Sequence, residues 1–380
     1  MLRIRLIAAL AGLVPVLALT GAADSALARP AVPGGPSAPV ARAVKASTSA
    51  FRVLVSRHYG TAANASGYSV IVATGTRQAW VFGGTNPGGP SMPVADRWNG
   101  RTMTPSALPP GLTGFISDAS APSATDIWAA SEYGGYVLHW NGVRWKLAMR
   151  WPRGTITGLT AVSASNVWVF GTTATGLRGT GTWHFNGKAW RRVGGAAASI
   201  YRASAASGRD IWAIAAGPKA DSILVNRGRS WRPVRTGRVL AGVILHDVLA
   251  ISADSVWVVG DEVSAGSVRL VLAHWNGTSW SRIPTRMRAW PRRLARGPNG
   301  TVLITATSAA GASGLILQAG IHGWRPAVTI QSDLGSGVAD VAMLRRARSL
   351  LASGGILTRS GGNAVIWMRR LGPVHRPDAE

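Results

Sequence analysis

The sequence predicts an all-β fold, a β-propeller of seven four-stranded blades, because the chain repeats itself every 40 to 48 residues from about residue 68. The first marker of the repeat is a short apolar segment that carries Trp and follows a polar turn. It occurs at Trp80, Trp128, Trp168, Trp212 and Trp257, and Leu303 and Leu351 take its place in two weaker copies. Such a period, built from short strands, is typical of propeller blades. Six or eight blades also fit this spacing.

The second marker is an aromatic-Asn-Gly hairpin downstream of the first. Its copies are Trp98-Asn99-Gly100, Trp140-Asn141-Gly142, Phe185-Asn186-Gly187 and Trp275-Asn276-Gly277. Three residues after each Gly comes a large apolar residue: Met103, Trp145, Trp190 or Trp280. Asn-Gly predicts a two-residue type I′ hairpin, which sets Trp275 opposite Thr278 and on the same face as Trp280. The fourth unit keeps Gly228 and Trp231 but lacks this Asn.

The composition supports a globular repeat domain and excludes several classes of protein. The 380 residues include 47% hydrophobic residues, 17 tryptophans and no cysteine. A disordered chain is excluded by the apolar content, and disulfide scaffolds, thiolate metal sites and iron–sulfur clusters by the missing cysteines. The repeated indoles are assigned to packing between blades, because they recur at the same place in each unit.

The N-terminus predicts export. Arg3 and Arg5 precede the apolar run 6–19, and Ala26-Leu27-Ala28 matches a signal-peptidase site, so residues 1–28 are interpreted as a signal peptide. We therefore expect a secreted protein, extracellular or associated with the cell envelope, without a transmembrane segment after signal removal. The Pro/Ala/Gly-rich residues 29–50 predict a flexible tether.

The propeller is predicted over residues 51–372, with a tail at 373–380. In the fifth unit the four strands are expected at 245–251, 256–260, 271–275 and 278–283. The seventh unit has strands at 348–355 and 364–367 but lacks a fourth. The strand-like segment 51–55 precedes the first unit, and we expect it to supply that outer strand and close the ring.

These repeats resemble the Trp-rich repeats of secreted bacterial, actinobacterial-type propellers, which are grouped with kelch and galactose-oxidase-like propellers. Trp80-Val81-Phe82-Gly83-Gly84 is similar to a kelch strand that ends in Gly-Gly. The resemblance implies a fold over residues 68–367 and leaves the function open. The copper site of galactose oxidase requires a Tyr–Cys crosslink, which this chain lacks. A sialidase assignment is disfavoured because no Asp-box is intact. We expect no cofactor.

Acidic residues offer few candidates for catalysis. Glu132 with Asp261 or Glu262 could form a glycosidase pair, but the latter two are interpreted as solvated turn residues. Asp247 and Asp340 are expected on inner strands that line the central channel, where two carboxylates are too few for a hard cation. No catalytic residue and no metal ligand is therefore assigned.

Three of the seven histidines precede the hairpin at equivalent places in the repeat, namely His139, His184 and His274. Their recurrence predicts a structural role beside the buried indoles. His246, next to Asp247, stands outside this pattern.

The chain carries a formal charge of +26, and removal of residues 1–28 lowers it to +25. Only four of the 41 basic residues are lysines, which is compatible with coding bias as well as with adhesion to a polyanion.

Two arginine-flanked indoles are the candidate ligand-binding residues. They belong to two segments that are expected in loops leading to the next inner strand: Trp151 and Arg153, and Arg288, Trp290, Arg292 and Arg293. Such groups suit an anionic glycan by stacking and ion pairing. The alternative is that the indoles fill the junctions between blades.

The sequence therefore favours a secreted, non-enzymatic propeller that binds a ligand or partner through its loop face. The concrete partner is an anionic cell-wall glycopolymer, with another surface protein as a second option. An extracellular glycan hydrolase acting at the channel mouth, with Asp247 and Asp340, is the alternative. Export disfavours nucleic acid, and the oligomeric state stays open.

Overall fold

The computed structural model describes residues 51–371, apart from 60–64, 87–89, 153, 172–179, 195–199, 218–219, 229, 265, 312, 322, 331–335, 345–347 and 359–360. The predicted signal peptide (1–28), tether (29–50) and tail (373–380) lie outside these residues. No helix in the described ranges has the length and hydropathy needed to cross a membrane.

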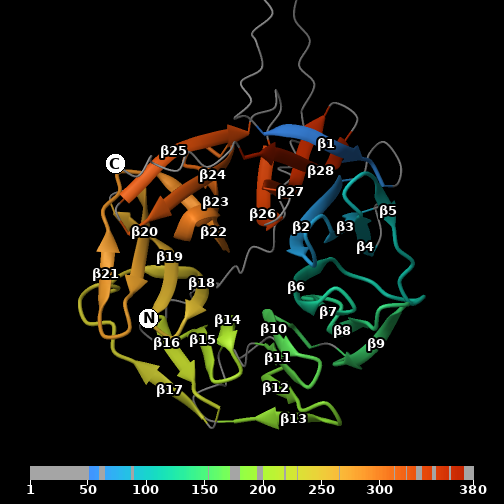
Figure 1. Cartoon of the computed structure of the whole chain (residues 1–380), viewed down its shortest axis with the longest axis horizontal. Coiled ribbons are helices and arrows are strands. Elements are labelled where there is room, and N and C mark those ends of the chain that lie inside the picture. Colours follow the sequence, from blue (N-terminus) through green and yellow to red (C-terminus); the bar gives the residue numbers. More distant parts are fainter. Residues whose placement is uncertain are drawn as a thin grey trace, which may run out of the picture.

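The described strands form a ring of seven blades around a central channel (Figure 1), which confirms the predicted fold class. Each blade is an antiparallel sheet whose strands run in chain order from the channel to the rim, except that β1 is the outer strand of the seventh blade. From inner to outer strand, the blades are β2 (Ala65–Ala73), β3 (Ala79–Asn86), β4 (Met92–Trp98) and β5 (Met103–Pro105); β6 (Ile116–Ser123), β7 (Asp126–Ser131), β8 (Tyr136–Trp140) and β9 (Trp145–Arg150); β10 (Gly158–Ser163), β11 (Asn166–Phe170), β12 (Thr182–Phe185) and β13 (Trp190–Val193); β14 (Ile200–Ser207), β15 (Asp210–Ala215), β16 (Ser222–Asn226) and β17 (Trp231–Val234); β18 (Ile244–Ser252), β19 (Ser255–Ser264), β20 (Ser267–Trp275) and β21 (Trp280–Ile283); β22 (Ala289–Arg296), β23 (Val302–Ser308), β24 (Gly314–Gly320) and β25 (Gly323–Ile330); and β26 (Ser336–Leu344), β27 (Ser349–Thr358), β28 (Gly361–Arg370) and β1 (Arg52–Arg57).

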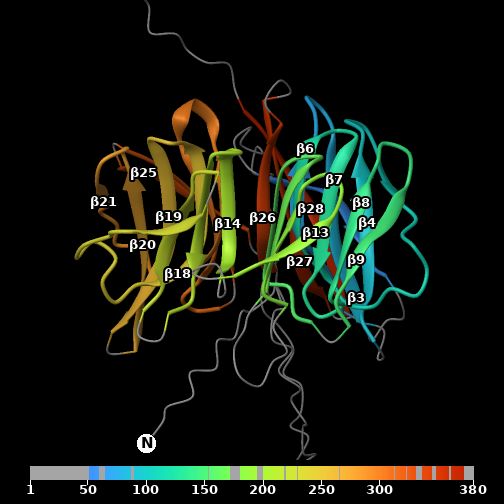
Figure 2. The same ribbon diagram turned by 90° about the horizontal axis from the view of Figure 1, so that it is seen from below.

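This topology gives the disc two different faces, seen edge-on in Figure 2. One face holds the hairpins between the second and third strands and the connections that cross to the next blade, and we call it the crossover face. The opposite face holds the turns between the first and second strands and the hairpins between the third and fourth strands, and we call it the turn face.

The ring is closed by β1, as the sequence predicts. β1 pairs antiparallel with β28, with Arg52 opposite Met368 and Arg57 opposite Ala364. The seventh blade thus combines one N-terminal strand with three C-terminal strands. Leu54 and Val55 of β1 pack against the core cluster that the first and seventh blades share.

A buried carboxylate fixes this closure to the first blade. Asp96, on β4, is inaccessible to solvent and forms an ion pair of 3.0 Å with Arg57 at the end of β1. Its other oxygen accepts hydrogen bonds from the hydroxyls of Tyr59 and Tyr68. Because all of this carboxylate's partners are charged or hydroxyl donors, the buried charge is compensated.

The repeated indoles fill the junctions between blades, as predicted. The indole of Trp212 on β15 is almost fully buried and meets Trp275 and Trp280 of the next blade at ring distances of 5.7 and 6.1 Å. Trp80 and Trp128 are covered in the same way by aromatic pairs from the second and third blades. Aromatic contacts of this geometry stabilise a junction beyond the burial of their area.

The hairpin register differs from the predicted two-residue turn. Trp275 pairs with Trp280, so the loop holds the four residues 276–279. Asn276 adopts no positive φ; its side-chain oxygen instead accepts hydrogen bonds from the backbone of Thr278 and Ser279, and only Gly277 has a positive φ, of 98°. The asparagine thus caps the turn with its side chain. Trp275 and Trp280 still share a face, because directly paired residues do.

Candidate functional site

The wall of the channel carries one equivalent position on each inner strand. In six of the seven blades it is the residue that follows a β-bulge, where the strand bends. In chain order these residues are Val70, Asp118, Gly158, Arg202, Asp247, Arg293 and Asp340. Alternating acidic and basic residues therefore face one another across the channel, and we call the five charged ones the channel ring.

The three aspartates of the channel ring join neighbouring blades. In each case a carboxylate oxygen accepts a hydrogen bond from a backbone amide of the next inner strand: Leu159 N at 2.9 Å for Asp118, Leu294 N at 2.7 Å for Asp247 and Ile71 N at 3.1 Å for Asp340. The amide in question belongs to the residue after the equivalent position. This recurrence explains why aspartate, with its short side chain, occupies these places.

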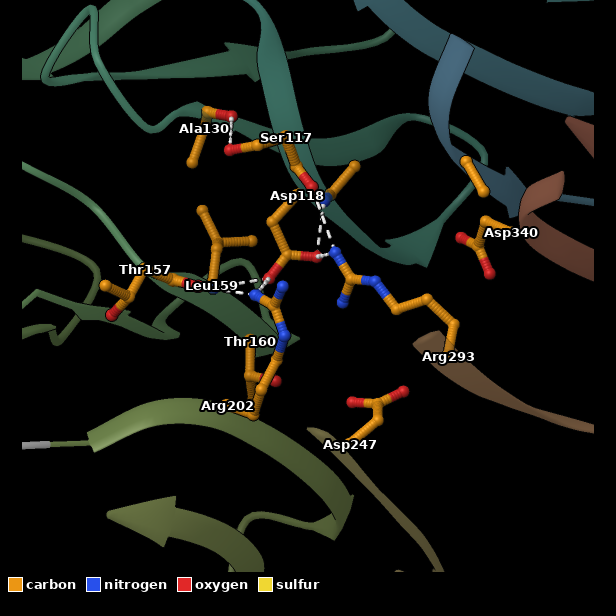
Figure 3. Close-up of polar contacts among 12 residues, drawn as sticks. Ser117, Asp118, Ala130, Thr157, Leu159, Thr160, Arg202, Asp247, Arg293 and Asp340 are labelled. Carbon is orange, nitrogen blue, oxygen red and sulfur yellow. Dashed lines mark hydrogen bonds and ion pairs between the residues drawn. The ribbon is translucent and has the colours of Figure 1, made fainter. Parts of the chain in front are cut away.

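The two arginines extend the network across the channel (Figure 3). Arg293 of the sixth blade reaches the second blade, where it pairs with Asp118 at 3.3 Å and donates to the carbonyl of Ser117 at 2.9 Å. Arg202 approaches Asp118 from the other side at 3.9 Å and donates to the carbonyl of Thr157. Asp118 thus lies between two guanidinium groups, and Asp247 and Asp340 point toward the same space.

Burial dominates the electrostatics of the channel ring. It raises the pKa of Asp340 to about 7 and also raises that of Asp247, although Arg293 opposes both shifts. Burial lowers the pKa of Arg202. For Arg293 burial acts in the same direction, but the attraction of Asp118, Asp247 and Asp340 outweighs it and raises the pKa. Arg293 therefore stays charged, while Asp340 exchanges its proton near neutral pH.

A cavity of about 230 Å³ lies against these residues, with Asp118, Asp247, Arg293 and Asp340 in its lining. The pair Asp247 and Asp340, considered for a hydrolase, does face this cavity. Each carboxylate, however, already accepts a backbone hydrogen bond, and Arg293 acts on the pKa of both. Arg293 and Arg202 also act on Glu132, whose pKa burial raises to about 7. The arrangement is that of a compensated structural network.

The other proposed acidic pair has a different setting from the expected one. Asp261 is almost fully buried and hydrogen-bonded to His246, so its assignment as a solvated turn residue is wrong. Glu262 is partly exposed and pairs with Arg282 at 2.8 Å. Both belong to β19, which runs further than predicted, and the long ladder to β20 explains why they are held in a strand.

The three recurrent histidines have the predicted structural role. His139, His184 and His274 each stack on the indole opposite them at 4.2 to 4.3 Å, namely Trp128, Trp168 and Trp257. The first residue of the second strand bonds the imidazole in each case, through Asp126, Asn166 or Ser255. No group of three or more acidic or histidine side chains suited to a metal ion occurs among the described residues.

The basic segment Arg288–Arg293 is not the crossover loop that was expected. Residues 289–296 form β22, the inner strand of the sixth blade. Pro291 lies at the bulge of this strand, a place where proline fits a sheet. Arg293 therefore points into the channel, whereas Trp290 is 42% exposed at the start of the strand.

Arg288, Trp290 and Arg292 form a small basic and aromatic platform on the crossover face. Arg288 is exposed, and Arg292 donates from Nε to the hydroxyl of Thr307 at 3.2 Å. Within the described residues neither guanidinium is paired with a carboxylate. The platform thus offers positive charge beside an exposed indole.

The other predicted binding segment, which contains Trp151 and Arg153, has a different setting from the platform. Trp151 is half-buried and packs edge-on against Trp183 and Trp190 of the third blade, at 5.6 and 6.0 Å. It fills a junction between blades, which is the alternative considered for it. Arg153 lies outside the described residues.

Exposed apolar side chains gather on the crossover face. Five of the nine large ones that are exposed lie there among the described residues: Met92, Tyr133, Ile244, Val263 and Trp290. Ile244, Val263 and Trp290 belong to the adjacent fifth and sixth blades.

The comparisons with known proteins support the fold. No family model and no curated protein matches the sequence. Among solved structures, YCF48 bound to a D1 peptide matches with a TM-score of 0.57 and 14% identity, over 88% of this chain and 98% of that one. YCF48 from Cyanidioschyzon merolae matches with a TM-score of 0.51 and 13% identity, over 80% and 96%.

A glycan-degrading enzyme shares the architecture as well. The GH74 xyloglucanase from Xanthomonas campestris matches with a TM-score of 0.54 and 15% identity, over 81% of this chain and 53% of the enzyme. The propeller thus corresponds to about half of that protein. At these identities the likeness concerns the fold, which serves peptide binding in one neighbour and glycan hydrolysis in another.

Proposed function

We propose that this chain is a non-enzymatic binding protein that holds an anionic ligand on its crossover face, at the platform of Arg288, Trp290 and Arg292. The observation that carries the proposal is the exposed indole of Trp290 near the exposed Arg288, whose guanidinium has no carboxylate partner within the described residues; Arg292, whose pKa burial lowers, lies deeper. A guanidinium pairs with carboxylate or phosphate, and an indole stacks on the face of a sugar or on a cation. The apolar side chains nearby enlarge the contact.

The proposed ligand is an anionic glycopolymer of the cell envelope. A protein exported by the predicted signal would meet such polymers, and the formal charge of the full chain, +26, favours their capture. The peptide bound to YCF48 supports binding by this architecture in general and makes an acidic surface protein the competing partner. Kinship with kelch and galactose-oxidase-like propellers belongs to the same proposal and rests on the repeats alone.

The hydrolase alternative has weaker support. Its candidate pair, Asp247 and Asp340, accepts hydrogen bonds from backbone amides of the next inner strands and is attracted by Arg293, so both carboxylates already serve to join the blades. If the pair were catalytic, Asp247→Asn with Asp340→Asn would abolish glycan turnover. We expect purified protein to show no turnover to abolish.

Cosedimentation with purified cell wall tests the proposed function. The test variant is Arg288→Gln with Trp290→Ala, and the matched control is Arg144→Gln with Val143→Ala, an exposed pair on the turn face. We expect the test variant to lower the pelleted fraction about fivefold or more, since a charged contact and a stacking contact are each worth about 1 kcal/mol. The control should pellet like the wild type.

Two results would overturn the proposal. One is an equal failure of the wild type to pellet at low and at high salt. The other is an equal loss of the pelleted fraction in the test variant and the control, which would show that positive charge contributes to binding wherever it lies on the surface.

A further inference from the structure

A second binding site follows from a break in the aromatic pattern of the rim. At three junctions an aromatic ring from the third strand of the next blade covers the buried indole: Trp140 on Trp80 at 4.9 Å, Phe185 on Trp128 at 5.6 Å and Trp275 on Trp212 at 5.7 Å. At the junction of the third and fourth blades this place belongs to Asn226, at the end of β16. Trp168 therefore lacks one of its two covering rings and keeps only Trp231.

The presence of Asn226 at the place of an aromatic residue is linked to the hairpin that follows it. In the first, second, third and fifth blades the turn is capped by an asparagine directly after the aromatic residue. In the fourth blade Asn226 itself caps the turn, because its side-chain oxygen accepts a hydrogen bond from Gly228 N at 2.8 Å. The capping residue has moved back by one position, and the position after it holds Arg227, which pairs with Asp210 at 3.5 Å. The fourth blade therefore keeps the capped turn but has no aromatic side chain at this place.

The missing ring leaves a groove of about 510 Å³ over Trp168. Its lining combines rings, amides and residues without bulk: Asn166, Trp168, His184, Val193, Gly194, Gly208, Asn226, Gly228, Ser230 and Trp231. Trp168 is 8% exposed, against 1 to 2% for Trp80, Trp128 and Trp212, which keep both covering rings. The volume lies within the range of ligand pockets, about 300 to 1,000 Å³.

The polar groups of the groove have defined roles. Trp168 donates from Nε1 to Asn166 Oδ1 at 2.8 Å, which identifies that atom as the amide oxygen. His184 therefore donates from Nε2 to the same oxygen, at 3.0 Å, and burial lowers its pKa. A neutral imidazole bonded in this way keeps its Nδ1 as an acceptor.

The side chain of Asn226 supplies a hydrogen-bond donor to the groove. Its residue is only 3% exposed, and its Oδ1 is engaged by Gly228 N, while its Nδ2 has no hydrogen-bond partner among the described residues. This amide N–H₂ is therefore the donor that Asn226 offers to a ligand in the groove. The exposed Ser230 adds a hydroxyl at the rim of the groove.

We propose that this groove binds a neutral pyranose ring of a glycan. The described residues that line it offer amide, imidazole, hydroxyl and indole groups, which suit hydroxyls and C–H groups. A pyranose presents C–H groups that pack on an indole and hydroxyls that bond to amide, imidazole and hydroxyl groups. An aromatic side chain would fill the same space but would leave Asn226 Nδ2 without a partner. The site lies on the rim, apart from the platform on the crossover face.

Tryptophan fluorescence and ligand-observed NMR with a panel of neutral sugars test this site: glucose, galactose, N-acetylglucosamine and their short β-linked oligomers, with indole as the aromatic comparison. The main variant is Asn226→Trp with Arg227→Asn, which restores the Trp-Asn-Gly sequence of the other blades and fills the groove. We expect saturable binding of at least one sugar by the wild type and an affinity at least about tenfold lower in this variant, since a stacking face and a buried amide donor are both lost.

Ser230→Ala is the second variant, at an exposed position that does not endanger folding, and it should weaken the same sugar about two- to fivefold if the hydroxyl contributes one ordinary hydrogen bond. Arg288→Gln with Trp290→Ala serves as the control and should bind the sugar like the wild type, which separates this site from the proposed function. The inference is overturned if no sugar binds saturably, if indole binds and the sugars do not, or if the filled variant binds like the wild type.

Discussion

The channel and the rim join the same neighbouring blades by opposite physical means. At the rim, indoles such as Trp212 are buried against aromatic pairs from the next blade. At the channel, aspartates such as Asp247 accept a hydrogen bond from the next inner strand and face arginines. Burial of apolar area stabilises directly, whereas buried charges regain little more than the cost of their own desolvation. We infer that the rim provides most of the stability and the channel fixes how the inner strands meet.

The largest expected effect concerns the place where the ring closes. Deletion of residues 51–56 removes most of β1, exposes the outer edge of β28 and withdraws Leu54 and Val55 from their cluster. We expect the free energy of unfolding to fall by at least about 5 kcal/mol, from two apolar side chains and the strand's hydrogen bonds. The measurement is urea unfolding followed by fluorescence, and an unchanged midpoint or melting temperature would refute the closure by β1.

The next effect tests the rim. Trp212→Ala leaves a cavity in the junction between the fourth and fifth blades, because its indole is 1% exposed and touches Trp275 and Trp280. A loss of about 3 to 5 kcal/mol is expected, as for other large-to-small core substitutions. The loss of stability should be the same at pH 5 and pH 8, since the two rings that contact this indole, those of Trp275 and Trp280, do not titrate. A matched control is Trp290→Ala, which removes an exposed indole and should change stability by less than about 1 kcal/mol.

In the channel, we expect stability to depend on whether each buried charge keeps its partner, and not on how much apolar area is buried. Asp118→Ala deletes the carboxylate between Arg202 and Arg293 and frees the amide of Leu159. We expect a loss of about 3 kcal/mol, because two buried guanidinium groups remain with less compensation. Asp118→Ala combined with Arg202→Met should recover part of this loss in the same assay. A double variant less stable than the single one would contradict the view of a compensated network.

The smallest effect is a dependence on pH. The pKa of Asp340 is raised by burial to about 7, above its value of about 3.9 in an unfolded chain. The folded state therefore binds a proton more tightly than the unfolded state, so this group's contribution is complete below about pH 4 and is lost as the pH rises through about 7. Asp340→Asn should remove that part of the slope and gain about 1 to 2 kcal/mol at pH 8 relative to pH 5. Unfolding curves at both values, with Asp254→Asn as an exposed control, measure it.

The repeat made the blades predictable, because each unit must bury an indole against its neighbour and the same sequence therefore recurs. The closing strand was predictable from what the seventh unit lacked. The channel ring was predictable only in part. Asp247 and Asp340 stood out on predicted inner strands, but Asp118 and Arg202 follow bulges whose register no local pattern indicates. Their shared place in the repeat was the available signal.

Two sequence-based expectations depended on composition and were wrong for that reason. The proline and arginines of residues 288–293 are typical of a loop, yet they form an inner strand because Pro291 falls at a bulge. The fourth hairpin appeared to have lost its asparagine, whereas Asn226 performs the capping from the aromatic position. Both cases depend on a shift of one residue, which alters the face on which every following side chain lies.

The pairing of β1 with β28 also has a consequence for the order of events during synthesis. β1 leaves the ribosome first, and its partner strand ends at Arg370, more than 300 residues later. β1 must therefore stay unpaired while the blades between are made, and the ring can close only after β28 has been made. Contacts this distant in sequence make the last folding step slow and expose a strand edge until it occurs. A polypeptide whose last blade takes its outer strand from the other end of the chain therefore exists first as an open row of blades and becomes a closed disc only in its final folding step.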